Sequence, residues 1–207
     1  MDLVESPAVE SPAGRRRKAR RGEGDRLRIE IVDAASRLLA TTGEVGELSL
    51  RSVAREVGVA TTSIYLHFRN LDELVLAVKI RYFDEFGETL DAAAMSAGED
   101  MLSRVRARAH AYIRYGLEHR GRYRVLFTSE MLPAHLVGEA TLIGVEVFDA
   151  VRDEIAEVVG PDEDASLLAV HFWTALHGIV TLRTVRQRFP WPDLDHEVND
   201  LINRLLP

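Results

Sequence analysis

A run of hydrogen-bonding side chains follows the glycine at position 58. Thr61, Thr62 and Ser63 carry hydroxyls, and Tyr65 and His67 add a phenol and an imidazole. Such groups can donate hydrogen bonds to phosphate oxygens and meet base edges in the major groove of DNA. Small side chains at the N-terminal end of a short helix suit that groove. The run therefore predicts a helix that reads nucleic acid.

Two short helices are expected to position these groups. Ser49 can cap the first helix by accepting hydrogen bonds from its free backbone N–H groups. Gly58 tolerates the left-handed backbone that ends such a helix. A second helix is expected over 60–68, with Ile64 and Phe68 pointing inward. The buried face of the first helix is expected to hold Leu50, Val53, Ala54 and Val57.

Two longer helices are expected to flank this pair. The first runs from an N-cap at Asp25 to Thr41 and stops at Gly43; Ser36 packs on its apolar stripe of Ile29, Val32, Ala35 and Leu39. The second opens with the capping-box pattern Asn70-x-x-Glu73 and runs to about residue 94. Its inward positions include Leu74, Val75, Val78, Tyr82, Phe86 and Leu90.

The rest of the chain also favours helices, over about 100–119, 122–132, 139–159, 162–188 and 193–206. The breaks fall at Gly121, Pro133, Gly160-Pro161, Pro190 and Pro192. No strand alternation stands out, so the expected fold class is all-α. The expected division is a disordered basic arm (1–24), a three-helix DNA-binding domain (25–70) and a helical-bundle domain for ligand binding and dimerisation (71–207). The helix over about 70–94 connects the last two.

Charge is distributed unevenly between the two ends of the chain. The net charge is −7 overall, yet residues 1–70 carry 12 Lys/Arg against 10 Asp/Glu, and the remainder is at −9. A basic end on an acidic body can bind a polyanion through that end only. The basic run Arg15, Arg16, Arg17 and Lys18 in the arm could lie along phosphates; the alternative is a solvated tail.

Several classes of function find no support in the sequence. There is no cysteine, hence no disulfide and no thiolate metal site or nucleophile. The histidines lack metal-binding spacing, and no GxSxG, P-loop or GxGxxG motif occurs, so neither a metal, a cofactor nor a catalytic residue is expected. No uninterrupted apolar run approaches the length of a membrane span, and no secretion signal is visible. A cytoplasmic location is expected.

The residues over about 26–77 resemble the tetracycline-repressor (TetR/AcrR) family of bacterial transcription regulators. The resemblance rests on the turn AREVGVATTSIYLHF and the following NLDEL. It implies that Thr61, Thr62 and Ser63 face bases or phosphates. It also implies phosphate contacts by Tyr65 and His67, and a phosphate or guanine contact by Arg51.

Two residues depart from the pattern of the family. Ala60 stands where the family often has a capping serine, which leaves the second short helix less well capped. Leu71 stands where a phosphate-binding lysine is common, so that contact is expected to be lost.

The C-terminal part resembles the subgroup of that family whose regulatory domain is named for its Trp, His and Gly. The matching residues are Trp173, His177 and Gly178, followed by FPWPDLD at 189–195. The resemblance implies a small-molecule effector, expected to be apolar or aromatic. The residues that could line its cavity are Tyr112, Tyr115, Phe127, Met131, Phe148, Phe172, Trp173 and His177.

The same aromatic residues are what any bundle core requires, and a structural role is favoured for His177. Arg104, Arg106 and Arg108 are interpreted as a solvated face. The last two helices carry more apolar surface than one bundle needs, which predicts a homodimer interface made of Leu167, Leu168, Val170, Ala175, Ile179, Leu182, Leu201, Ile202 and Leu205.

The leading hypothesis is a dimeric repressor that a ligand releases from a palindromic operator in double-stranded DNA. One alternative is a constitutive DNA-binding or architectural protein whose C-terminal bundle only dimerises. An enzyme or a protein–protein adaptor is a third reading, which no motif supports.

Overall fold

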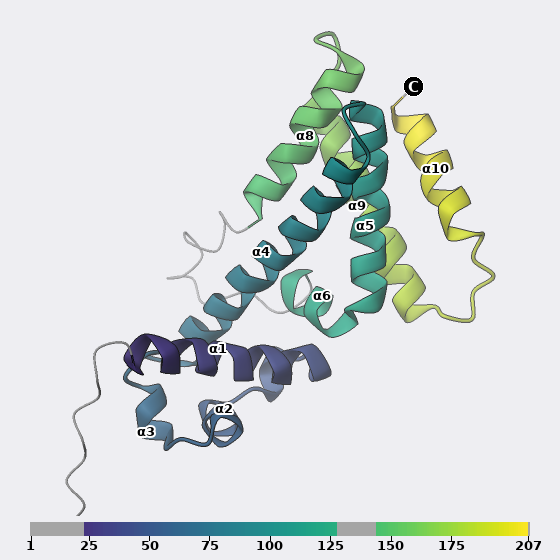
Figure 1. The fold of residues 1–207 in the computed structure, drawn as a ribbon. Helices are drawn as coiled ribbons and strands as arrows, with labels where there is room; N and C mark the ends of the chain where they lie inside the picture. Colours follow the sequence, from purple (N-terminus) through teal and green to yellow (C-terminus); the bar gives the residue numbers. More distant parts are fainter. Residues whose placement is uncertain (1–22, 128–143, 207) are drawn as a thin grey trace, which may run out of the picture.

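The computed structural model describes residues 23–127 and 144–206, and every regular element in those two ranges is helical (Figure 1). The N-terminal unit comprises α1 (Glu23–Thr42), a 3-10 turn (Val45–Glu47), α2 (Leu50–Val57) and α3 (Thr61–Ile64). The remaining elements are α4 (Leu71–Ser96), α5 (Met101–Glu118), α6 (Arg120–Phe127), α8 (Val145–Val159), α9 (Ala165–Val185) and α10 (Leu194–Leu205). The prediction of an all-α fold is confirmed.

Local sequence explains the shape of the N-terminal unit. Ser49 Oγ accepts a hydrogen bond from the backbone N–H of Ser52 (3.1 Å), and Ser52 Oγ accepts one from the N–H of Ser49 (3.1 Å). This reciprocal cap fixes the start of α2. Gly58 ends the helix in the left-handed region, with φ of +80°. The buried side chains that hold α1, α2 and α3 together are Ile31, Leu39, Leu50, Val53, Ala54, Ile64 and Phe68.

Helix α4 runs from the N-terminal unit into the C-terminal bundle (Figure 1). Asn70 Oδ1 accepts a hydrogen bond from the N–H of Glu73 (2.9 Å). The Glu73 carboxylate accepts from the N–H of Arg69 (2.6 Å), and this bond holds the pKa of Glu73 below its usual value. All six inward positions expected for this helix are buried, so α4 belongs to the core of both parts.

A buried ion cluster joins the helices of the bundle. Arg108 of α5 donates to Glu154 of α8 (2.8 Å) and to Asp91 of α4 (2.6 Å). Arg104 adds an ion pair to Glu154 (3.0 Å), while Arg106 donates to Asn199 of α10 (2.7 Å). The interpretation of the three arginines as a solvated face is therefore wrong for Arg108, because partners on two other helices compensate its burial.

The N-terminal unit also packs directly on α6. A Cβ on Gly121 would collide with the carbonyl of Ala40 near the end of α1. Arg124 forms an ion pair with Glu44 beside this contact. On the other side, the Tyr82 hydroxyl of α4 donates to the carbonyl of Ser36, and Arg81 pairs with Asp33. Two helices of the C-terminal bundle, α4 and α6, thus both contact the N-terminal unit, chiefly through α1.

The structure corrects several boundaries and one face. Helix α1 begins at Glu23, so Asp25 lies within its first turn and is not its cap. Ile29 is 59% exposed, because Ile31, about 200° away around the helix, takes the inward position. Gly121 lies inside α6 and not at a break, since its small size serves the contact with α1. Ile202, expected at a dimer interface, is buried in the bundle core.

Helix α9 has two apolar sides. Ala169, Phe172, Leu176 and Val180 are buried, whereas the exposed large apolar side chains on this helix are Leu167, Val170, Trp173, Leu182 and Val185. By length and composition alone α9 could cross a membrane. Of its most apolar stretch, 28% is buried inside the described structure. The apolar character of α9 does not appear as an uninterrupted run in the sequence, because His171, His177 and Arg183 interrupt it.

Candidate functional site

The predicted DNA-contacting side chains lie together at one end of the molecule, on and directly after α3. Thr62 is exposed, while Thr61 and Ser63 are half-buried. Their hydroxyls make no hydrogen bond with any residue in the described ranges. They are therefore available to an external partner.

Helix α3 is shorter than expected, since it ends at Ile64 and not at Phe68. The N–H groups of Leu66 and His67 donate back three residues, to Ser63 O (3.4 Å) and Ile64 O (2.9 Å). No side-chain hydrogen bond caps its start at Ala60, as expected for alanine there. The turn leaves Tyr65 56% exposed.

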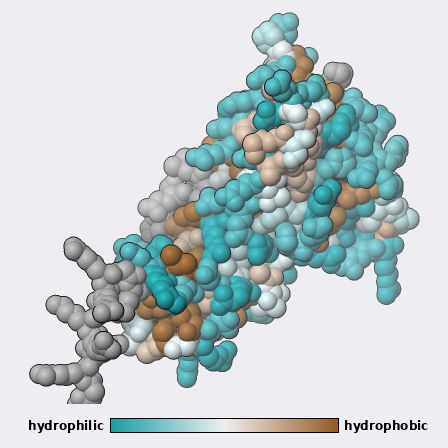
Figure 2. Space-filling model, viewed as in Figure 1, coloured by the Kyte–Doolittle hydropathy of each residue, from teal (hydrophilic) through white to brown (hydrophobic). Residues whose placement is uncertain are grey.

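The end of the N-terminal unit is not uniformly hydrophilic. Figure 2 shows brown apolar atoms among hydrophilic side chains at this end of the molecule. Leu66, in the turn after α3, is 77% exposed, the highest value among the exposed large apolar side chains of the described residues. A leucine in a helical pattern is normally interpreted as part of the core, so no signal in the sequence indicates that Leu66 is exposed.

Two exposed arginines lie on α2, the helix that packs on α3. Arg51 and Arg55 lie four residues apart on the exposed face of α2, and neither has an ion-pair partner among the described residues. By contrast, Arg37 pairs with Glu56 (3.3 Å) and Arg69 with Glu73 (3.4 Å). Arg55 was missed by the sequence reasoning, although its spacing from Arg51 was the available signal.

We call Arg51, Arg55, Thr61, Thr62, Ser63, Tyr65 and His67 the α2–α3 surface. It offers unpaired guanidinium groups, free hydroxyls and a ring on two packed helices and the turn that follows them. These are groups that can bind phosphates and base edges. Leu71 is the first residue of α4 and packs against the core, so it offers nothing to a phosphate. Arg15, Arg16, Arg17 and Lys18 lie outside the described residues.

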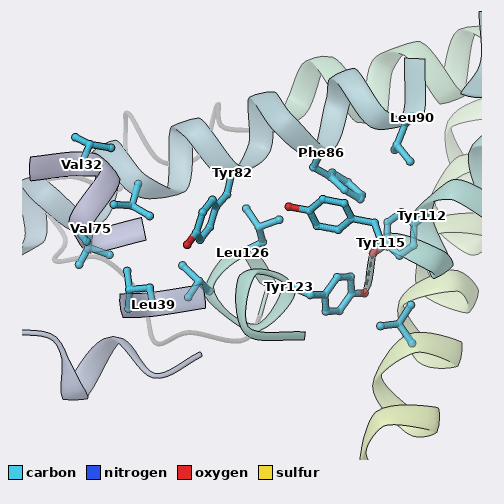
Figure 3. Packing of buried hydrophobic residues seen from close by; sticks show 14 of the residues in the cluster. Val32, Leu39, Val75, Tyr82, Phe86, Leu90, Tyr112, Tyr115, Tyr123 and Leu126 are labelled. Carbon is cyan, nitrogen blue, oxygen red and sulfur yellow. Dashed lines mark hydrogen bonds between the residues drawn. The ribbon is translucent and has the colours of Figure 1, made fainter. Parts of the chain in front are cut away.

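A second group of side chains, aromatic and partly polar, lies inside the bundle (Figure 3). We call Phe86, Tyr112, Tyr115, Tyr123, Phe127 and His177 the aromatic cluster. Phe86 lies edge-on to Tyr115 (centroids 5.0 Å apart) and to Tyr112 (5.2 Å). Tyr123 lies 4.8 Å from Phe127 and stacks on His177 at 5.6 Å. The cluster thereby connects α4, α5, α6 and α9.

A chain of hydrogen bonds runs through the aromatic cluster. The Tyr112 and Tyr123 hydroxyls lie 3.0 Å apart, as the dashed line in Figure 3 marks, and the Tyr123 hydroxyl lies 2.7 Å from His177 Nδ1. Burial raises the pKa of Tyr112 to about 12 and raises that of Tyr123 further. Burial also lowers the pKa of His177, which favours the neutral imidazole. The Tyr115 hydroxyl is also buried; it interacts with the Arg122 guanidinium but makes no hydrogen bond of normal geometry among the described residues.

Several predicted ligand-contacting residues lie in or beside the aromatic cluster. Tyr112, Tyr115, Phe127 and His177 belong to it. Trp173 lies beside it, since its side chain interacts with the Tyr112 hydroxyl, and it also pairs with Phe148, with ring centroids 6.4 Å apart. Trp173 is 44% exposed. Phe172 is buried in the bundle core, and Met131 lies outside the described residues.

Sequence reasoning missed two members of the aromatic cluster. Tyr123 precedes Phe127 by one helical turn, and that spacing was the available signal. Phe86 was assigned only to the core. Within 23–127 and 144–206, no three His, Asp or Glu side chains gather in a way that could hold a metal ion.

Family comparisons agree with this arrangement. Residues 31–78 match the model of the TetR family of bacterial regulatory proteins, and residues 105–206 match the tetracycline-repressor-like C-terminal domain. The two matches lie on either side of the connecting part of α4 and together cover most of the chain. The chain belongs to the TetR family of transcriptional regulators and carries its helix–turn–helix.

Individual relatives match the chain at low sequence identity. The HTH-type transcriptional regulator Rv1816 of Mycobacterium tuberculosis is 29% identical over 149 residues, which cover 69% of this chain and 62% of the relative. The match thus spans less than two thirds of that relative's length.

Solved structures share the fold over a longer part of the chain. A protein of unknown function from Rhodococcus sp. RHA1 is 26% identical, with a TM-score of 0.72 and coverage of 95% of this chain and 97% of that chain. FadR of Bacillus subtilis, solved with stearoyl-CoA, shares the fold at 16% identity and a TM-score of 0.66, over 86% of this chain and 97% of that chain.

Proposed function

We propose that the protein is a homodimeric repressor that binds a palindromic DNA operator and is released by a small apolar or aromatic ligand. The observation that carries the proposal is the α2–α3 surface, where unpaired arginines and free hydroxyls stand side by side on a helix–turn–helix. We assign DNA binding to residues 25–70, and ligand binding and dimerisation to 71–207. Such a role places the protein in the cytoplasm.

The side chains of the α2–α3 surface divide between positioning and readout. Arg51, Arg55, Tyr65 and His67 bind phosphates and fix the register, while Thr61, Thr62 and Ser63 meet base edges. Leu66 is placed to meet a thymine methyl group, the apolar feature of the major groove. The basic arm, with Arg15, Arg16, Arg17 and Lys18, adds affinity that depends on salt.

The exposed side of α9 supports the dimer. Leu167, Val170, Leu182 and Val185 are each at least 42% exposed, and a second copy would cover them. A two-fold dimer sets two recognition helices in major grooves about 34–36 Å apart, or somewhat more, so the operator is palindromic. Pairing of α9 and α10 with their symmetry mates gives a four-helix interface.

The dimer can be tested by one matched pair of variants. Val185→Glu introduces a charge on the proposed interface, whereas Met95→Glu does the same at an equally exposed apolar position on α4 (70% and 69% exposed). Sedimentation equilibrium is expected to show monomers for Val185→Glu and dimers for Met95→Glu. Dimers of equal strength in both variants would reject α9 as the interface.

The aromatic cluster supports a ligand site that is coupled to DNA binding. Three of its members, Phe86, Tyr123 and Phe127, lie on α4 and α6, the two helices that contact α1. A ligand that moved either helix would therefore alter the spacing of the recognition helices. Such a ligand must bind the two arrangements with different affinities. That FadR of Bacillus subtilis was solved with stearoyl-CoA is consistent with an apolar ligand in a protein of this fold.

Selection of DNA from a randomised duplex pool at physiological salt tests the proposal. Recovery of a palindrome is expected, and the recovered sequence then allows ligands to be screened by loss of binding. Salt-sensitive binding without sequence preference would favour the architectural reading, in which the bundle only dimerises. A ligand that saturates the protein without changing operator affinity would reject induction by that compound.

A further inference from the structure

The exposed side of α9 has a symmetric order of side chains. At 3.6 residues per turn, Leu167, Thr174, Gly178 and Val185 lie within about 40° of one another, on the side of the helix opposite the buried Phe172. We call these four residues the outer face of α9. Leu167 and Val185 are each nine residues from position 176, and Thr174 and Gly178 are each two residues from it. The outer face therefore has a large apolar side chain at each end and small residues in the middle.

The glycine in the middle of the outer face has no role inside the fold. Gly87, Gly116 and Gly121 also lie inside α-helices, and a Cβ at each would press on another helix, at 3.1 Å or less. A Cβ at Gly178 would meet nothing within 4 Å. Glycine destabilises the interior of a helix relative to alanine. The small size of Gly178 is therefore useful only to a molecule that packs on this face.

Opposite charges stand at the two ends of α9. Asp162, Glu163 and Asp164 precede the helix, Arg186 and Arg188 follow it, and all five side chains are exposed. None of them forms an ion pair within 23–127 or 144–206. Asp164 and Arg188 are each twelve residues from position 176. A second α9 that ran in the opposite direction about this position would therefore bring its basic end to the acidic end of the first.

We propose that two copies of the chain pack their α9 helices antiparallel, about a two-fold axis at position 176. Leu167 then meets the partner's Val185, and Thr174 meets the partner's Gly178. The ends join large apolar side chains, and the small middle lets the helices approach closely, as a self-complementary interface requires. The proposal rests on the proposed function, because it gives the homodimer its orientation and register.

Charge selects the antiparallel direction over the parallel one. Parallel helices in the same register would place the acidic turn before α9 against the acidic turn of the partner, and Arg186 and Arg188 against their own copies. Like charges across an interface oppose association, whereas complementary charges fix its register. The antiparallel pair places opposite charges together at both ends.

Cross-linking tests the direction and the register. The chain has no cysteine, so an introduced cysteine reports a single position. Leu167→Cys and Val185→Cys are made in the full-length protein, and each variant alone and their equal mixture are treated with a short bismaleimide. The two copies of either position would lie about 27 Å apart along the antiparallel helices, so neither variant alone is expected to cross-link. The mixture is expected to give covalent dimers. Self-linking of either variant, or no covalent dimer in the mixture, would overturn the proposal.

A second test concerns the close approach at the glycine. Gly178→Leu is expected to weaken association at least about tenfold in sedimentation equilibrium, because the added side chain forces the helices apart. Leucine favours a helix more than glycine does, so a weaker α9 could not explain the loss. Ala92→Leu enlarges an exposed residue on α4 and is expected to leave association unchanged. Equal association of both variants would overturn the contact at Gly178.

The two tests can fail without the proposed function. Self-linking of Leu167→Cys, in a protein that Val185→Glu converts to monomers, would uphold a dimer through α9 and reject its antiparallel register. The expected cross-links in a protein that selects no palindrome would uphold the register and reject the operator. Monomers of the unchanged protein would reject both, and would leave the outer face of α9 to a membrane or another protein.

Discussion

On the α2–α3 surface, Tyr65 and His67 have no partner among the described residues, whereas in the aromatic cluster Tyr112, Tyr123 and His177 are joined by hydrogen bonds. The two regions use tyrosine and histidine for different purposes. Groups that must bind a partner outside the protein stay unpaired and accessible. Groups that hold helices together satisfy one another in the core, because a buried group without a partner destabilises the fold.

The largest expected effect is on the α2–α3 surface. Charge reversal of Arg51 and Arg55 together is expected to weaken DNA binding by at least about 1 kcal/mol per position, because we propose that each guanidinium binds a phosphate. Fluorescence anisotropy on the selected duplex measures this loss. Arg114→Glu, which changes an exposed arginine on α5, should bind DNA as the unchanged protein does; equal losses in both would indicate a general charge effect.

A smaller effect is expected at the contact between α6, which carries part of the aromatic cluster, and α1, which packs on α2. Gly121→Ala places a methyl group against the Ala40 carbonyl, and the resulting overpacking is expected to cost about 1–3 kcal/mol of unfolding free energy. Urea denaturation measures it. Gly46→Ala is the control, since a Cβ at Gly46 meets nothing within 4 Å. Unchanged stability in Gly121→Ala would show that α6 does not press on α1.

The cluster itself offers a matched pair of tyrosines. Tyr123→Phe removes the hydroxyl that connects Tyr112 with His177, and the loss is expected to cost about 1–2 kcal/mol. Tyr115→Phe removes a buried hydroxyl that interacts with the Arg122 guanidinium but makes no hydrogen bond of normal geometry among the described residues, and it is expected to cost clearly less. Equal losses in urea denaturation would contradict the assigned hydrogen-bond chain.

The smallest expected effect is a dependence of stability on pH. Because burial lowers the pKa of His177 in the folded protein, the unfolded chain binds a proton more readily. The contribution of His177 to the free energy of unfolding is complete above the ordinary histidine pKa. It is lost as the pH falls through the pKa that His177 has in the folded protein. His177→Asn should flatten the fall of the urea midpoint between pH 7.5 and 5.5, and an unchanged slope would assign that fall to other groups.

The α2–α3 surface was largely predictable from sequence because its signals are local. The cap at Ser49, the glycine turn and the spacing of hydroxyls lie within twenty residues, and the structure places them as expected, apart from the shorter α3. Ile29 could not be placed, because which face of α1 is buried depends on α4 and α6, far along the chain.

The aromatic cluster was only partly predictable. Tyr112, Phe127 and His177 were grouped by residue type, but the contacts that unite them join residues up to 54 positions apart in sequence, as for Tyr123 and His177. Arg108 shows the same limit, since its partners Asp91 and Glu154 are on two other helices. Nothing local distinguishes a buried, paired arginine from a solvated one.

Hydrogen–deuterium exchange of the protein with and without its selected duplex tests most directly that the α2–α3 surface reads DNA. New protection is expected to concentrate in residues 49–68, where α3 is one turn long and the amides of Leu66 and His67 donate back only three residues. Amides of the aromatic cluster should change little on DNA binding. Protection elsewhere, with residues 49–68 unchanged, would contradict DNA binding through the α2–α3 surface.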